Sequence, residues 1–119
     1  MEQIPNSEKI NPNELMKRLD RAVQYGSRED LLALFDGGMD INQVDFSGRT
    51  ALQLLSFSGD EEGVRILIER NADVNHVYMH HDRIPLTALD AARERGHKKV
   101  VDLLLEHGAK TGRELQPKA

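Results

Sequence analysis

The chain has 119 residues and a mass of 13.4 kDa, which is enough for one ordinary domain and too little for two independent hydrophobic cores. Sixteen Lys and Arg against twenty Asp and Glu give a net charge of −4 and a pI near 5.7, a balance that argues against a nucleic-acid partner. The absence of cysteine excludes disulfides, zinc ribbons, iron–sulfur clusters and thiol nucleophiles, and it fits a reducing compartment.

Apolar residues are distributed along the chain without a long continuous run. The opening is polar, and no stretch reaches the roughly eighteen apolar residues that a membrane span needs, so we expect a cytoplasmic protein with no membrane partner. Aromatic residues make up only 4% of the chain, so the core must be built from Leu, Val, Ile and Ala. That composition favours helices packed on helices, and we predict an all-α fold.

The first predicted helix follows a polar lead at residues 1–11. Asn11-Pro12-Asn13-Glu14 combines a capping side chain, a proline at the first helical position and a carboxylate three residues after the cap. This pattern predicts that a helix begins at Pro12 and ends before Gly26.

From this point the chain repeats itself. Gly26, Gly59 and Gly96 occupy equivalent places, 33 and 37 residues apart, with four extra residues in the second interval. The same offsets superpose the apolar stretches 31–35, 64–68 and 101–105. A fixed period in this range predicts a repeat protein, here with units at about 12–44, 45–77 and 78–109 within one domain at 12–109.

Each unit predicts a helix, a glycine turn, a second helix and an extended stretch. Thr50 and Thr87 stand at N-cap positions, and the three glycines end the first helices in the left-handed conformation. The second helices are predicted at 28–36, 61–69 and 98–106, with Gly38, Asn71 and Gly108 closing them. The expected core positions on these helices are Phe35, Val64, Leu67, Ile68, Val101, Leu104 and Leu105. Residues 110–119 are polar and predict a flexible tail.

Three motifs carry a family resemblance, which extends from about Pro12 to Ala109. They are Gly48-Arg49-Thr50-Ala51-Leu52, Asn71-Ala72-Asp73-Val74-Asn75, and the run from Thr87-Ala88-Leu89-Asp90-Ala91-Ala92 through Gly96-His97 to Gly108-Ala109. When they are aligned by the repeat period, these motifs resemble ankyrin repeats. The resemblance implies a solenoid whose hairpin tips and exposed first-helix faces form a concave surface that binds proteins.

The chain departs from the family pattern at several positions. Ala51 and Ala88 replace its proline, and Gln53 and Asp90 replace its histidine, so we expect an altered side-chain link between neighbouring hairpins. Gly63 stands where an aliphatic residue is common, and we expect it to thin the packing of its helix. The resemblance assigns His97 to packing at the start of a second helix.

The concave surface that the resemblance implies collects four of the five aromatic residues, and Phe35 is left for the core. The alternative is that some of these rings pack against their own repeat, because single exposed hydrophobic residues are normal. The predicted partner-binding residues are Tyr25, Phe46, Ser47, Arg49, Phe57, Ser58, Tyr78, Met79, His80, His81, Arg83, Glu94 and Arg95.

Catalytic signatures are weak in this sequence. Ser58 lacks the preceding glycine of a nucleophile elbow, and Gly37-Gly38 lacks the Lys-Ser/Thr of a phosphate-binding loop, so we predict no enzyme and no cofactor. A metal-ligand character appears in one loop, although its spacing is irregular and cysteine is absent. That loop contains His76, Tyr78, Met79, His80, His81 and Asp82.

We therefore predict a non-catalytic module that binds another protein and blocks or neutralises it, as a bacterial toxin-immunity protein does. The acidic balance would suit a basic partner. Two alternatives remain: an adaptor or scaffold subunit in a larger assembly, and a metal-binding module that uses the histidine-rich loop. We expect the free protein to be monomeric.

Overall fold

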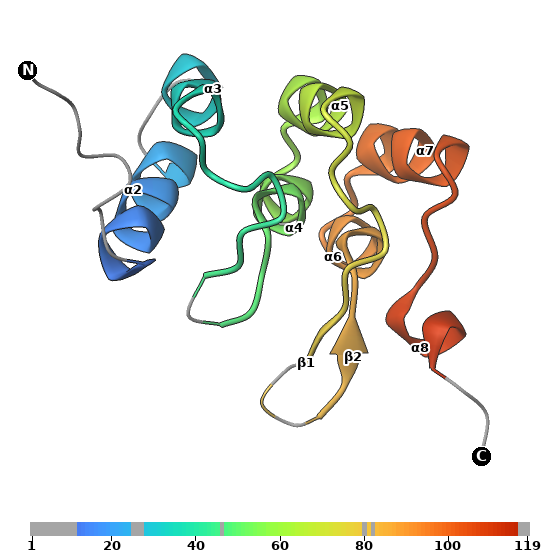
Figure 1. The fold of residues 1–119 in the computed structure, drawn as a ribbon. Helices are drawn as coiled ribbons and strands as arrows, with labels where there is room; N and C mark the ends of the chain where they lie inside the picture. The colour runs from blue at the N-terminus through green and yellow to red at the C-terminus, as the bar shows by residue number, and fades with distance from the viewer. Residues whose placement is uncertain (1–11, 25–27, 46, 80, 82, 117–119) are drawn as a thin grey trace, which may run out of the picture.

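The fold is a row of helix pairs. A computed structural model describes residues 12–24, 28–45, 47–79, 81 and 83–116. The pairs are α2 (Pro12–Gln24) with α3 (Arg28–Asp36), α4 (Ala51–Ser58) with α5 (Glu61–Glu69), and α6 (Ala88–Glu94) with α7 (Lys98–Glu106). Figure 1 shows them side by side, with the segments between pairs projecting to one side. The predicted all-α solenoid of three units is confirmed.

The segment between the second and third pairs forms a short β-hairpin. Strand β1 (Tyr78–Met79) pairs antiparallel with β2 (Pro85–Leu86), so that Tyr78 faces Leu86 and Met79 faces Pro85. This hairpin is the longest projection below the helices in Figure 1. The four extra residues of the second interval belong to this projecting segment.

The helices begin and end where local signals predicted. Thr50 Oγ1 accepts from the Gln53 amide at 3.3 Å, and Gln53 Oε1 accepts from the Thr50 amide at 2.8 Å, which completes a capping box. Thr87 and Asp90 form the same box at the start of α6. The helix-ending residues Gly38, Gly59, Asn71, Gly96 and Gly108 all have positive φ, while Gly26 lies outside the described residues. The predicted starts and ends of α2 and of the three second helices are confirmed.

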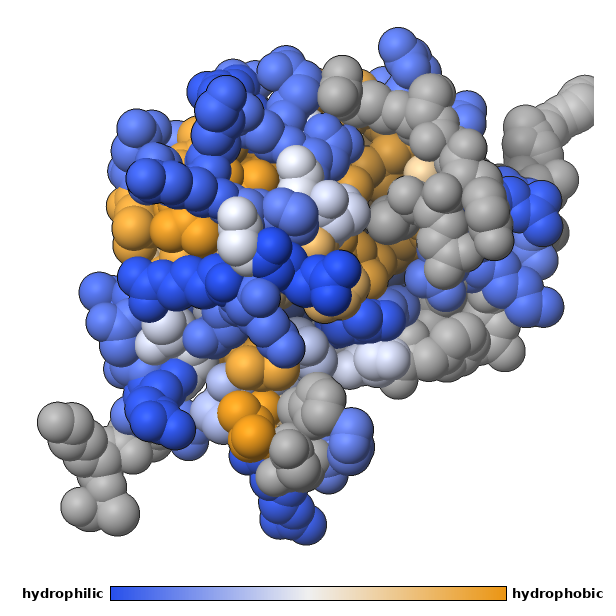
Figure 2. All heavy atoms as spheres, turned by 180° about the vertical axis from the view of Figure 1, so that it is seen from behind, coloured by the Kyte–Doolittle hydropathy of each residue, from blue (hydrophilic) through white to orange (hydrophobic). Residues whose placement is uncertain are grey.

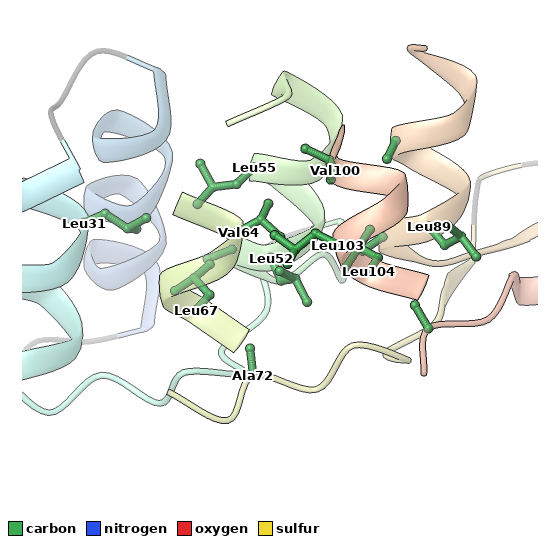
Figure 3. Packing of buried hydrophobic residues seen from close by; sticks show 14 of the residues in the cluster. Leu31, Leu52, Leu55, Val64, Leu67, Ala72, Leu89, Val100, Leu103 and Leu104 are labelled. Carbon is green, nitrogen blue, oxygen red and sulfur yellow. The ribbon is translucent and has the colours of Figure 1, made fainter. Parts of the chain in front are cut away.

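The hydrophobic core runs along the row between the helices. Its aliphatic side chains point toward one another from successive pairs (Figure 3), and full burial of each Leu or Val contributes about 1.5–3 kcal/mol. The largest fully buried ones are Leu19, Leu52, Leu67, Leu89, Leu104, Val64 and Val100. Phe35, Ile68 and Val101 are partly buried and pack against this cluster, so their assignment to the core holds only in part.

Leu105 is a correction, because its side chain is 45% exposed. It occupies the same register as Phe35 and Ile68, which pack against the core. Helix α7 is the last second helix in the described part of the chain, so no following pair covers this position. The helix position that packs against the core in the first two units is therefore exposed to solvent in the last one.

Gly63 does not thin the packing of α5, contrary to our expectation. A Cβ at this position would lie 2.9 Å from Leu55 Cδ1 and 2.6 Å from Asp60 Oδ2, so neighbouring side chains already occupy the space. Asp60 Oδ1 also accepts from the Gly63 amide at 2.9 Å and caps the helix. A Cβ at this position would therefore force the Asp60 or Leu55 side chain to move.

The predicted flexible tail is also wrong in part, because Gly112–Leu115 form the one-turn helix α8. Thr111 caps it: the Glu114 carboxylate accepts from the Thr111 amide at 2.8 Å, and Thr111 Oγ1 accepts from the Glu114 amide at 3.1 Å. The Gly112 amide donates to Asp90 Oδ2 at 2.7 Å. A Cβ on Gly112 would collide with the backbone carbonyl of Pro85, so glycine allows α8 to lie directly against β2. Residues 117–119 lie outside the described residues.

At both positions where the family histidine is replaced, the side chain bonds to the backbone of the extended segment that follows its own helix pair. Gln53 Nε2 donates to the His76 carbonyl at 2.7 Å, and Asp90 Oδ2 accepts from the Gly112 amide. The first link uses a donor and the second an acceptor, so the two have opposite polarity. A further hydrogen bond joins the first and second units, because Asn42 Oδ1 accepts from the Asp73 amide at 2.8 Å.

Candidate partner-binding groove

A groove of about 500 Å³ opens beside the projecting hairpin. The tip before α4, the hairpin strands, and the C-terminal ends of α4 and α6 all contribute to it. In Figure 2, hydrophobic side chains gather on the projecting hairpin at the bottom of the view and stand among hydrophilic ones. The groove is lined by Ser47, Arg49, Phe57, Tyr78, Met79, His81, Leu86 and Glu94.

The structure brings most of the described residues that we predicted into this one groove, but three of them do not line it, namely Ser58, Arg83 and Arg95. Ser58 is exposed and its hydroxyl donates to the Leu55 carbonyl at 3.1 Å, whereas Arg83 lines a separate hollow beside α8. Leu86 was missed, although it precedes Thr87 as Arg49 precedes Thr50 and the repeat alignment was enough to find it. Tyr25, Phe46 and His80 lie outside the described residues.

Phe57 is the aromatic residue at the end of α4, and its side chain is 45% exposed. The guanidinium carbon of Arg95 lies 4.7 Å from the centre of its ring, a cation–π contact. On the backbone side, His97 Nε2 lies 2.9 Å from the Phe57 carbonyl. A carbonyl only accepts, so Nε2 carries the proton in this hydrogen bond. The third unit therefore holds Phe57 from two sides, and His97 has the structural role expected of it.

Arg49 is positioned by a buried carboxylate. Asp45, which is 5% exposed, accepts from the amides of Ser47 and Arg49 at 2.8 and 3.0 Å and from Arg49 Nη2 at 3.3 Å. The turn needs the positive φ of Gly48, whose carbonyl lies 2.9 Å from His76 Nε2. These bonds hold Asp45, Ser47, Gly48 and Arg49 together and join them to His76 after α5.

Tyr78 lines the groove, and burial raises the pKa of its hydroxyl above the ordinary value of 10.0. The positive charge of Arg49 opposes this effect on the pKa, while the negative charge of Glu94 adds to it. The hydroxyl is therefore protonated at neutral pH. It can donate or accept a hydrogen bond in the groove.

The described residues contain no group of three or more His, Asp or Glu side chains that could hold a metal ion. His76 Nε2 is already engaged with the Gly48 carbonyl. His80 and Asp82 of the same loop lie outside the described residues. Within the described ranges, no helix has the length and apolar character required to cross a membrane.

The family model described as ankyrin repeats, in three copies, matches residues 19–114. The chain therefore belongs to the ankyrin-repeat family. Ankyrin repeats are protein–protein interaction modules, and the fold is generally non-catalytic. The helix pairs and projecting tips described above agree with this assignment.

Curated relatives share the repeat region. The chain is 36% identical over 92 residues to the B-cell lymphoma 3 protein homolog of Mus musculus, covering 74% of this chain and 20% of the relative. It is 38% identical over 64 residues to an L-asparaginase of Dirofilaria immitis, covering 54% and 11%. The palmitoyltransferase Hip14 of Drosophila melanogaster is 28% identical over 107 residues, covering 90% and 16%. The chain thus spans a fifth or less of the length of these relatives.

Proposed function

We propose that this chain binds a partner protein through the groove beside its hairpin, and that binding itself blocks or neutralises the partner, as in a toxin-immunity protein. One observation carries the proposal. Phe57 and Met79, with side chains 45% and 53% exposed, line the same groove, whereas the buried core of the described residues contains no aromatic side chain. Large apolar side chains that line a groove with a polar rim are typical of recognition sites.

The groove has the properties of a preorganised binding surface. Phe57 is held by Arg95 and His97, and Arg49 is held by Asp45, so a partner would not have to order these side chains. Aromatic anchors of this kind each contribute about 2 kcal/mol or more. Two anchors that each contribute about 2 kcal/mol would together change the dissociation constant by about a thousandfold.

A second candidate is an adaptor or scaffold role. The relatives carry the matched region within much longer proteins, which favours a repeat module that tethers other parts of an assembly. For either role we propose a cytoplasmic protein, monomeric when free, with neither nucleic acid nor a membrane as its partner. The charge of −4 and the lack of cysteine support this assignment.

The test begins with affinity capture of the partner from the source cell. Calorimetry then compares the wild type with the Phe57→Ala, Met79→Ala double variant. The matched control is Ile84→Ala, Leu105→Ala, which removes apolar side chains of similar exposure outside the groove. We expect the groove variant to weaken binding by well over tenfold and the control by less than about threefold, with circular dichroism unchanged in both.

The same experiment separates the two roles. Equal losses in the two variants would mean that the partner uses another face. If the groove variant alone loses affinity, the captured partner is assayed for its own activity in the complex. A blocked activity supports neutralisation, whereas a retained activity supports the adaptor role.

A further inference from the structure

The charged side chains at the groove differ in whether they already have a partner. Arg49 Nη2 contacts the Asp45 carboxylate at 3.3 Å, and Arg95 lies over the Phe57 ring at 4.7 Å. Glu94 is exposed at the end of α6, and its carboxylate makes no hydrogen bond or ion pair with any residue that the structure describes. Arg49 and Arg95 thus have contacts within the molecule, whereas the Glu94 carboxylate has none among the described residues.

Other charges near the groove do not change this balance. Asp90 Oδ2 accepts from the Thr87 and Gly112 amides at 2.9 and 2.7 Å, so this carboxylate already holds two backbone amides of the fold. The positive charge of Arg93 helps to lower the pKa of Glu114 in α8, and Arg83 lines the separate hollow beside that helix. The Glu94 carboxylate is therefore the charge that the groove offers to an incoming segment.

Apolar surface lies beside this carboxylate. Phe57, Met79 and Leu86 line the same groove as Glu94 and come from α4 and the two hairpin strands. Tyr78 also lines the groove, and its neutral hydroxyl adds a hydrogen-bonding group without charge. The surface thus combines an apolar floor with one available negative charge.

Resting on the proposed function, we propose that the partner segment carries a Lys or Arg next to a Leu, Met or aromatic residue. The apolar side chain packs on Phe57, Met79 and Leu86, and the cation pairs with Glu94. Long basic side chains suit this arrangement because their methylene stems also cover apolar surface. An acidic segment would meet Glu94 with like charge, and Arg49 is already paired with Asp45.

Selection of short random peptides displayed on phage tests this proposal without knowledge of the natural partner. Wild type, Glu94→Gln and Glu94→Lys are selected in parallel, and Glu106→Lys on α7 is the matched control, because Glu106 is also exposed but lies outside the groove. We expect wild type and the control to enrich Lys or Arg beside an apolar residue. Glu94→Lys should enrich Asp or Glu instead.

Affinities of the selected peptides complete the test. A peptide selected on wild type should bind Glu94→Gln about three- to tenfold more weakly, and Glu94→Lys more weakly still. Peptides that depend on Phe57 and Met79 but ignore the charge at position 94 would overturn this inference and leave the proposed function intact. If no peptide depends on Phe57 and Met79, both the groove and the charge preference are wrong.

Discussion

The turn that ends α4 allows a sharp stability prediction, because the residue there faces both a backbone and a steric restriction. Gly59 has a φ of +85°, and a Cβ at this position would lie 2.6 Å from Cε1 and Nδ1 of His97. Gly96, the equivalent residue of the next unit, has a φ of +74°, and apart from its two chain neighbours no atom lies within 4 Å of a Cβ there. Substitution of each glycine by alanine therefore separates the two effects.

The expected magnitudes follow from these contacts. Alanine in the left-handed region costs about 1–2 kcal/mol, and this cost applies to both variants. Gly59→Ala must also displace the His97 ring and disrupt its 2.9 Å hydrogen bond to the Phe57 carbonyl, which adds about 1 kcal/mol or more. The gain from reduced freedom of the unfolded chain is the same in both variants and cancels in the comparison.

Urea unfolding followed by circular dichroism measures the two free energies. We expect Gly59→Ala to be less stable than Gly96→Ala by about 1 kcal/mol or more. In a His97→Ala background the difference should vanish, because the obstructing ring is gone. Equal losses in the original background, within about 0.5 kcal/mol, would refute the role of His97 as a clamp between units.

Three further predictions test the core, a cap and the C-terminal helix. Leu104→Ala should lower the free energy of unfolding by about 3–5 kcal/mol and Leu105→Ala by less than about 1, because only the first side chain is buried. Gln53→Ala should lower the free energy of unfolding by about 2 kcal/mol in the same urea assay. It removes both the capping bond from the Thr50 amide and the bond to the His76 carbonyl. The hydrogen bond from the Thr111 amide lowers the pKa of Glu114 below 4.5. Helix α8 should therefore keep this cap above pH 4.5 and lose it as the pH falls through the lowered pKa. NMR of the Thr111 amide would report the change.

The placement of the groove residues was partly open to prediction. The resemblance to ankyrin repeats implied that hairpin tips and first-helix faces share one surface, and the repeat alignment then assigned Arg49, Phe57, Met79 and Glu94 to it. It did not reveal which charges are engaged. Arg49 is paired with Asp45 four residues away, but Arg95 finds its partner on a different helix.

Two errors have a common cause. Gly63 was expected to leave a gap, but Leu55 from the preceding helix fills the space. Leu105 was expected in the core, but no described pair follows α7 to cover it. Periodicity indicates which face of a helix is apolar, whereas the neighbouring helices decide how much of that face is buried.

The sequence by itself determined the helix boundaries and the number of units, because capping hydroxyls and left-handed glycines act on amides and carbonyls within a few residues. Thr50 with Gln53, three residues apart, is such a pair. Only the tertiary structure decided the bond of His97 to the Phe57 carbonyl, 40 residues away, and left the Glu94 carboxylate without a partner among the described residues. Contacts at that separation depend on how successive helix pairs stack, and local signals do not encode their side-chain geometry.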